Sequence, residues 1–285
     1  MLIRRRGTTK PTEAVLDLTP PHMTVAAREA LRSYTPARIA LRSTGVSLAT
    51  GPLLDFQLAH ARARDAVNAA IDVRMLCDEL RRTGMPALAL ESQAKDRATY
   101  LRRPDLGRAL SQDSASLLTP GEYDVVFVIA DGLSALAVER HALRLMGAIL
   151  PLISGWRLAP VCVVTQGRVA VGDAIGEALR APLAVVLIGE RPGLSSPDSL
   201  GAYITWMPRP GRTDAERVCI SNIRSEGLSY KEAADQLERT VKNARARRFT
   251  GVASPDRAVA GTQAGAQGRI PGRTPAGGSE RETER

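Results

Sequence analysis

The sequence predicts an α/β protein with a mostly parallel sheet, and the stretch 160–194 carries most of this prediction. Two short runs in it, VCVV and LAVVLI, are continuous, apolar and mostly β-branched, as expected of strands that are buried on both faces. A glycine-bearing loop and a segment with a helical pattern separate the two runs. Strand, loop, helix and strand in this order predict a βαβ unit with parallel strands, and hence a Rossmann-like C-terminal domain.

The same stretch predicts where a ligand would bind. In an open parallel sheet, ligands lie outside the carboxyl ends of the strands. Two predicted loops reach that edge, Thr165–Asp173 and Gly189–Leu194. Glycines at positions 167, 172 and 176 would let a ligand approach the backbone closely, although their spacing matches no strict phosphate-binding motif.

A smaller, mainly helical domain is predicted over residues 23–120, after a flexible basic N-terminus over residues 1–22. Residues 23–32 are expected to form a short helix. Pro52 then stands in the first turn of a long helix that ends near Gly84, since proline suits the start of a helix and glycine the position after its end.

Residues 85–122 show no regular period and are expected to be irregular. They carry arginines that either clamp an anion or a carboxylate-rich partner, or lie on the surface without a role: Arg97, Arg102, Arg103 and Arg108.

The α/β domain is predicted over residues 121–252. Its first buried strand is VVFVIA, and Asp131 follows that strand, where a carboxylate can hydrogen-bond a ligand or cap the next helix. After the βαβ unit, YITWM predicts a further strand. Ser229 and Glu232 have the spacing of a capping box and predict a last helix that ends near Phe249.

Composition narrows the function classes. The 285 residues are 44% hydrophobic, enough for a sizeable core. The formal net charge of +9 either reflects an acidic partner or comes from arginines scattered on solvated helix faces beside acidic residues. Aromatic residues make up only 4%, which argues against a platform that stacks single-stranded nucleic acid, and no nucleic-acid recognition motif is present. Residues 253–285 have almost no large apolar side chains and are expected to be a disordered tail.

The sequence shows no membrane-spanning or secretory segment and no known catalytic motif. No apolar run is long enough to span a membrane, the start lacks a secretory segment, and three separated cysteines predict neither disulfides nor a zinc site, so a cytoplasmic protein is expected. There is no phosphate loop, zinc-protease or serine-hydrolase motif. Each of His22, His60 and His141 is expected to be solvated or satisfied in the core. The residues themselves therefore predict no catalytic group and no metal site.

Several phrases of the sequence, from about residue 36 to 252, resemble the small subunit of ethanolamine ammonia-lyase: DFQLAHARARDAV, YLRRPDLGRALS, DVVFVIADGLSA, GRVAVGDAIGEAL, LIGERPGL and CISNIR. The resemblance implies a carbon–nitrogen lyase that converts ethanolamine to acetaldehyde and ammonia by radical chemistry with adenosylcobalamin. It further implies that a large subunit holds the substrate and the catalytic side chains, while this chain closes over the cobalamin at the interface. The family's role in ethanolamine catabolism makes the basic N-terminus a candidate signal for entry into a bacterial microcompartment.

The resemblance also carries three cofactor contacts to this chain: Val169 of GRV, Glu190 of GERPGL and Cys219 of CISNI. Val169 and Glu190 fall on the two loops at the predicted ligand edge. Glu190 is expected to accept an amide N–H bond from an arm of the corrin ring, a contact worth about 1.5–3 kcal/mol, or else to pair with an arginine such as Arg191. Val169 and Cys219 are expected to supply backbone groups or packing, and Cys219 is not expected to ligate cobalt.

The histidines bear on how the cofactor would bind. Proteins that replace the cofactor's own lower base use a histidine in the context D-x-H-x-x-G, and no histidine here has a glycine three residues later. The resemblance therefore implies the base-on form, in which cobalt keeps dimethylbenzimidazole. The alternative is a homologue without catalysis, an α/β ligand-binding or scaffold protein that would give no turnover beside a large subunit.

Overall fold

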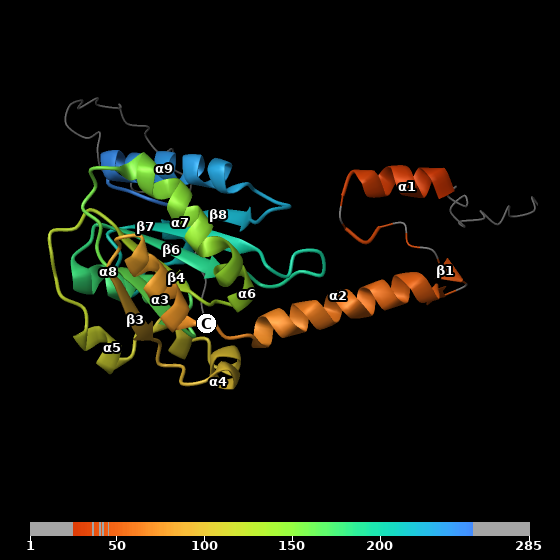
Figure 1. The fold of residues 1–285 in the computed structure, drawn as a ribbon, viewed down its shortest axis with the longest axis horizontal. Coiled ribbons are helices and arrows are strands. Elements are labelled where there is room, and N and C mark those ends of the chain that lie inside the picture. The colour runs from red at the N-terminus through yellow and green to blue at the C-terminus, as the bar shows by residue number, and fades with distance from the viewer. Residues whose placement is uncertain (1–24, 36, 40, 42, 45, 253–285) are drawn as a thin grey trace, which may run out of the picture.

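The structure is a computed structural model that describes residues 25–35, 37–39, 41, 43–44 and 46–252 (Figure 1). It confirms the predicted fold class, because a mostly parallel six-stranded sheet carries helices on both faces. The start and the tail that the sequence predicts to be flexible, residues 1–22 and 253–285, lie outside the described residues.

The sheet has the strand order β3-β5-β4-β6-β7-β8, with β3 to β6 parallel and the last two strands antiparallel. The predicted βαβ unit is β5, α8 (Val171–Leu179) and β6. β4 lies between its two strands, so β5 and β6 run parallel without pairing with each other. The strand bounds are β3 Ala87–Glu91, β4 Val126–Ala130, β5 Val161–Thr165, β6 Leu183–Gly189, β7 Leu200–Trp206 and β8 Arg217–Ile223.

Helices cover both faces of the sheet (Figure 1). One face packs against α3 (Val73–Arg82), α7 (Leu143–Ile149) and α9 (Tyr230–Arg247), and the other against α8 and the segment between β3 and β4. Every residue of β4 and β6 is buried, which explains why these strands read as continuous apolar runs. Cys162 of β5 is a buried core residue, and burial raises the pKa of its thiol to about 12.

Residues 85–122 are not irregular, and this prediction is wrong. β3 forms an edge of the sheet and pairs in parallel with β5. Its sequence, ALALE, is short and half exposed, as an edge strand can be, so it gives no clear apolar run. The sheet thus takes one strand from the part of the chain that the sequence assigns to the helical domain. The elements that follow β3 are α4 Arg97–Arg102, η1 Leu106–Arg108 and α5 Gln112–Ser116.

The long helix predicted from Pro52 to Gly84 is also wrong, because it is broken into α2 (Thr50–Asn68) and α3. Asp72 causes the new start, since its carboxylate accepts the backbone N–H of Met75 at 2.9 Å as the N-cap of α3. α2 projects from the sheet (Figure 1). The elements before it are α1 Val25–Ser33, β1 Ser43–Thr44 and β2 Ser47–Leu48.

The remaining helical elements follow β4 or flank β8. After β4 come α6 (Ala135–Ala137), the π-helical turn η2 (Val138–Ala142), α7 and η3 (Leu150–Ile153). The predicted capping box at the start of α9 is confirmed by both of its hydrogen bonds. The short helix η4 (Asp214–Glu216) stands between β7 and β8. Within the described ranges, no helix is long and apolar enough to cross a membrane.

Candidate ligand-binding site

A cavity of about 300 Å³ opens at the carboxyl ends of the parallel strands, as the sequence predicts for a ligand site. Val169 and Glu190, which the sequence places on two different loops, both line it. Cys219 does not line it, but lies on β8 opposite Tyr203 of β7, whose side chain does. The structure therefore brings two of the three predicted residues together and places the third beside them.

Asp131 fixes the loop that carries Val169. Its buried carboxylate accepts the backbone N–H groups of Gln166 at 2.8 Å and Gly167 at 3.0 Å, and Arg97 lies 3.8 Å away. Burial raises the pKa of Asp131 to about 6. The suggestion that Asp131 caps the next helix is wrong, because Ser134 is the N-cap of α6 and its hydroxyl accepts the backbone N–H of Ala137 at 3.2 Å. Asp131 instead joins the end of β4 to the loop after β5.

The loops after β4 and β6 touch backbone to backbone, which only glycine allows. The N–H of Leu133 donates to the carbonyl of Gly189 at 2.9 Å. A Cβ on Gly189 would lie 2.0 Å from the carbonyl oxygen of Ser134. Gly132 has a φ of +57°, in the region that favours glycine. This contact fixes the backbone from which the next residue, Glu190, reaches the cavity.

The carboxylate of Glu190 is held by three donors from neighbouring strands. Oε2 accepts the hydroxyl of Ser199 at 2.5 Å and the N–H of Asn222 at 3.3 Å, and Oε1 accepts the hydroxyl of Ser221 at 2.6 Å. The alternative of an ion pair with an arginine is wrong, since no ion pair among the described residues includes Glu190. A carboxylate has about four acceptor sites, so one site, on Oε1, is left for a ligand.

Gly201 makes room for that carboxylate. A Cβ there would lie 2.9 Å from Oε1 of Glu190 and 3.2 Å from its Cγ. Sequence reasoning did not identify Ser199, Gly201 or Ser221, because they reach Glu190 only through the pairing of β6, β7 and β8. A glycine inside a strand was the one available signal, since it often marks close approach.

Cys219 is an exposed residue of β8 whose register partner on β7 is Tyr203. Partial burial raises the pKa of its thiol, and the nearby charge of Glu190 acts in the same direction. The thiol therefore stays protonated at neutral pH. The described residues hold no group of three or more histidine, cysteine or acidic side chains that could bind a metal ion.

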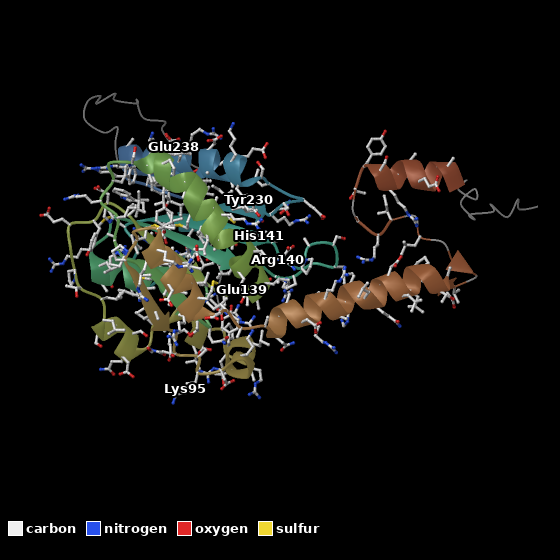
Figure 2. All side chains as sticks on the ribbon, viewed as in Figure 1. Lys95, Glu139, Arg140, His141, Tyr230 and Glu238 are labelled. Atoms are coloured by element: carbon white, nitrogen blue, oxygen red, sulfur yellow. The ribbon has the colours of Figure 1, made fainter. Side chains whose placement is uncertain are left out.

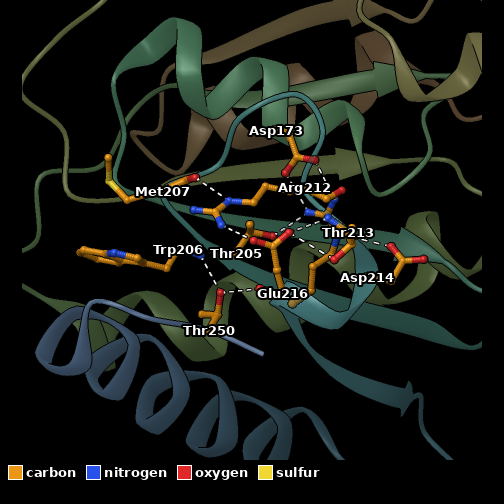
Figure 3. Close-up of polar contacts among 10 residues, drawn as sticks. Asp173, Thr205, Trp206, Met207, Arg212, Thr213, Asp214, Glu216 and Thr250 are labelled. Atoms are coloured by element: carbon orange, nitrogen blue, oxygen red, sulfur yellow. Dashed lines mark hydrogen bonds and ion pairs between the residues drawn. The ribbon is translucent and has the colours of Figure 1, made fainter. Parts of the chain in front are cut away.

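A buried ion pair ties α8, the helix after Val169, to the opposite end of β8. Asp173 of α8 accepts two hydrogen bonds from Arg217 at 2.6 and 2.7 Å, and each side chain is only 2% exposed. Thr205 accepts a further bond from Arg217 at 2.9 Å. Figure 3 shows this network between α8 and the loop that joins β7 to β8, where Arg212 also pairs with Glu216. The pair holds the first turn of α8, and thus the loop before it, against the sheet.

The structure describes two of the three histidines. His60 lies exposed on α2, and His22 lies outside the described residues. His141 of η2 is buried, with Nδ1 2.8 Å from the hydroxyl of Tyr230 and Nε2 3.4 Å from Asp198 (Figure 2). Burial lowers the pKa of His141, which favours the neutral ring. Its Nδ1 has a hydrogen-bond partner, but its buried Nε2 has none among the described residues, so the prediction that the core satisfies this histidine holds only in part.

Comparisons with known proteins identify the family of this chain. Residues 25–254 match the family described as ethanolamine ammonia-lyase light chain. The ethanolamine ammonia-lyase small subunit of Pseudomonas aeruginosa (strain UCBPP-PA14) is 55% identical over 236 residues, which cover 80% of this chain and 86% of that protein. The same subunit of Azotobacter vinelandii is 55% identical over 80% of this chain and 87% of that protein. That of Xanthomonas campestris pv. campestris is 52% identical over 83% of this chain and 91% of its own. The chain therefore belongs to the ethanolamine ammonia-lyase light-chain family.

Proposed function

We propose that this chain is the small subunit of an adenosylcobalamin-dependent ethanolamine ammonia-lyase, and that it holds base-on cobalamin at the interface with a large catalytic subunit. Membership of the light-chain family supports the enzyme and the partner. The observation that carries the cofactor assignment is the cavity at the sheet edge, which Val169 and Glu190 both line, with Cys219 beside it.

The chemistry of the cavity fits a corrin ring, whose rim carries acetamide and propionamide arms. Glu190 has one free acceptor site for an amide N–H. The backbone N–H groups of Val169 and Ala170 have no acceptor among the described residues and can donate to a ligand. No histidine of the described residues lines the cavity, in keeping with base-on binding.

Each side chain then has a definite task. When bound, adenosylcobalamin supplies radical chemistry through its cobalt–carbon bond. Glu190 orients the cofactor rim and is itself kept in place by Ser199 and Ser221. Val169 packs against the ring edge, and Cys219 stays a protonated thiol that packs beside Tyr203. Substrate contacts and proton transfers belong to the large subunit in this proposal.

The direct test is to co-express this chain with the large subunit encoded beside it, and to assay the complex anaerobically with ethanolamine and adenosylcobalamin. Acetaldehyde is expected only when both chains and the cofactor are present. A stable complex without turnover would favour a scaffold homologue, and the absence of any complex would refute the partnership.

A second test isolates Glu190. Glu190→Ala is expected to weaken cobalamin binding by the assembled complex about 10- to 100-fold, because it removes a charge-assisted hydrogen bond of about 1.5–3 kcal/mol. The measurement is equilibrium dialysis of cyanocobalamin, with circular dichroism to show that the subunit stays folded. Glu190→Gln keeps the shape and an acceptor oxygen and should lose less. Unchanged cofactor affinity in Glu190→Ala would contradict the assigned role.

A further inference from the structure

The cavity has more positive than negative charge available to a ligand. Arg108, Arg168 and Arg191 line it, and none of the three forms an ion pair within the part of the chain that the structure describes. The two carboxylates that line it are engaged, since Glu190 accepts three hydrogen bonds and Asp214 pairs with an arginine of β8 at 3.4 Å. Cations without partners around a concave site favour an anionic ligand.

Arg168 is held in place by the protein itself. Its guanidinium stacks 4.6 Å from the ring centre of the buried Tyr100, and Nη2 donates to the Tyr100 carbonyl at 3.2 Å. Arg97 stacks on the same ring at 4.7 Å. Gly107 leaves space for the stem, since a Cβ there would lie 3.1 Å from Cγ of Arg168. The buried Nε of Arg168 has no hydrogen-bond partner among the described residues. This guanidinium is therefore preorganised, with donor capacity left over.

The backbone next to Arg168 adds donors. The N–H groups of Val169 and Ala170 have no acceptor among the described residues, and they immediately precede the nine-residue helix α8. The side chain of Ala170, the N-cap, cannot accept a hydrogen bond, so no side chain competes for the donors at this end. Free N–H groups and the positive end of a helix dipole are the backbone part of many phosphate sites.

We propose that this cavity binds a phosphodiester anion, and that in the complete enzyme the anion is the phosphodiester in the nucleotide tail of base-on cobalamin. This inference rests on the proposed function. Arg108, Arg168 and Arg191 pair with the phosphate oxygens, and the N–H groups of Val169 and Ala170 donate to the same group. Glu190 keeps its separate task, which is to accept an amide N–H from the corrin rim.

The test compares two ligands on the assembled complex of this chain with the large subunit. Cyanocobalamin carries the nucleotide tail, whereas dicyanocobinamide has the same corrin ring and amide arms but no phosphodiester. Arg108→Gln and Arg191→Gln change exposed side chains and should leave the fold intact. Each is expected to weaken cyanocobalamin binding about tenfold, which corresponds to the smallest typical contribution of a hydrogen bond to a charged group. Each should leave dicyanocobinamide binding unchanged. Arg239→Gln, which removes one charge from exposed α9, is the matched control and should change neither affinity.

The other outcomes are equally informative. Equal losses for both ligands would overturn the proposal, because the arginines would then contact the corrin rim, and no loss for either would overturn it as well. Weaker association of the two subunits with unchanged cofactor affinity would assign the arginines to an acidic surface of the large subunit instead. If the parent complex binds neither corrin ligand, the proposed function fails first. Calorimetry with inorganic phosphate then tests the anion site separately. The proposal requires that the parent complex binds phosphate and that Arg168→Gln does not. Phosphate that still binds in the presence of saturating cyanocobalamin would identify a free phosphate as the ligand.

Discussion

Removing the charge of Asp173 should destabilise the chain strongly, because the substitution leaves Arg217 buried without its main partner. The two side chains form a bidentate pair that is almost entirely shielded from water. Breaking such a pair from one side typically costs about 3–5 kcal/mol, since the remaining charge keeps its desolvation penalty and loses its compensation. The substitution to make is Asp173→Asn, which keeps the shape and removes the charge.

For Asp173→Asn, the expected loss in the free energy of unfolding lies at the lower end of this range, about 3 kcal/mol, because Arg217 retains other hydrogen-bond acceptors. The hydroxyl of Thr205 lies 2.9 Å from it, and the carbonyl of Arg212 lies 3.1 Å from it. Asp214 also lies 3.4 Å away, but its side chain is 86% exposed, so water screens that contact. Asp214→Asn therefore serves as the matched control, with an expected loss below about 1 kcal/mol.

The assay is urea unfolding of the purified chain, with the free energy extrapolated linearly to water. A loss below about 1 kcal/mol in Asp173→Asn, or equal losses in Asp173→Asn and Asp214→Asn, would refute the reasoning. The double variant Asp173→Leu with Arg217→Met adds a second criterion. Replacing both charges by apolar groups of similar size removes the desolvation penalty together with the attraction, so its stability should be close to that of the parent chain.

Three further predictions concern the loops and the C-terminal end. The free energy of unfolding of Asp131→Asn should rise relative to that of the parent by up to about 3 kcal/mol as pH increases from 4 to 7. The reason is that the parent loses stability when it ionises a carboxyl whose pKa is about 6 in the folded chain and about 3.9 in the unfolded chain. Urea unfolding at several pH values measures this difference, and a difference that does not change with pH would contradict the prediction. Gly201→Ala should displace Glu190 and weaken cyanocobalamin binding by the complex about tenfold, whereas Gly147→Ala, with open space around it, should not. A chain that ends after Val252 should keep full acetaldehyde release, and a large loss of activity would show that the tail has a docking site.

The parts of the fold that the sequence predicts correctly are those with local signals. Continuous apolar runs identified β4, β5 and β6, and a capping box identified the start of α9. β3 was not predicted because its five residues show no clear strand pattern, and its pairing with β5 stabilises the strand instead. The break between α2 and α3 was not predicted because the helical period continues across it, and the only local sign is Asp72. Both failures occur where a distant contact or one side chain overrides the periodic pattern.

The candidate site was predictable only in outline. Strand runs and the rule that ligands bind at the carboxyl edge place the loops that hold Val169 and Glu190. The partners of Glu190 could not be predicted, because neighbouring Arg191 is the obvious candidate from sequence alone. The structure supplies Ser199 and Ser221 instead, from two strands whose register includes a β-bulge between Leu200 and Ala202. A shift of one residue would turn those hydroxyls away, and nothing local in the sequence fixes that register.

The antiparallel end of the sheet explains how the cavity can be preorganised. Parallel strands provide the loops, but β8 holds both of them, since Ser221 bonds to Glu190 and Arg217 bonds to Asp173 of α8. These two residues of β8 are four positions apart, or about 13 Å along an extended strand. A strand paired with β7 along most of its length changes shape little, so the two walls of the cavity keep a fixed separation before any ligand arrives. Substitutions that loosen β8 should therefore reduce cofactor affinity even when they touch no residue of the cavity.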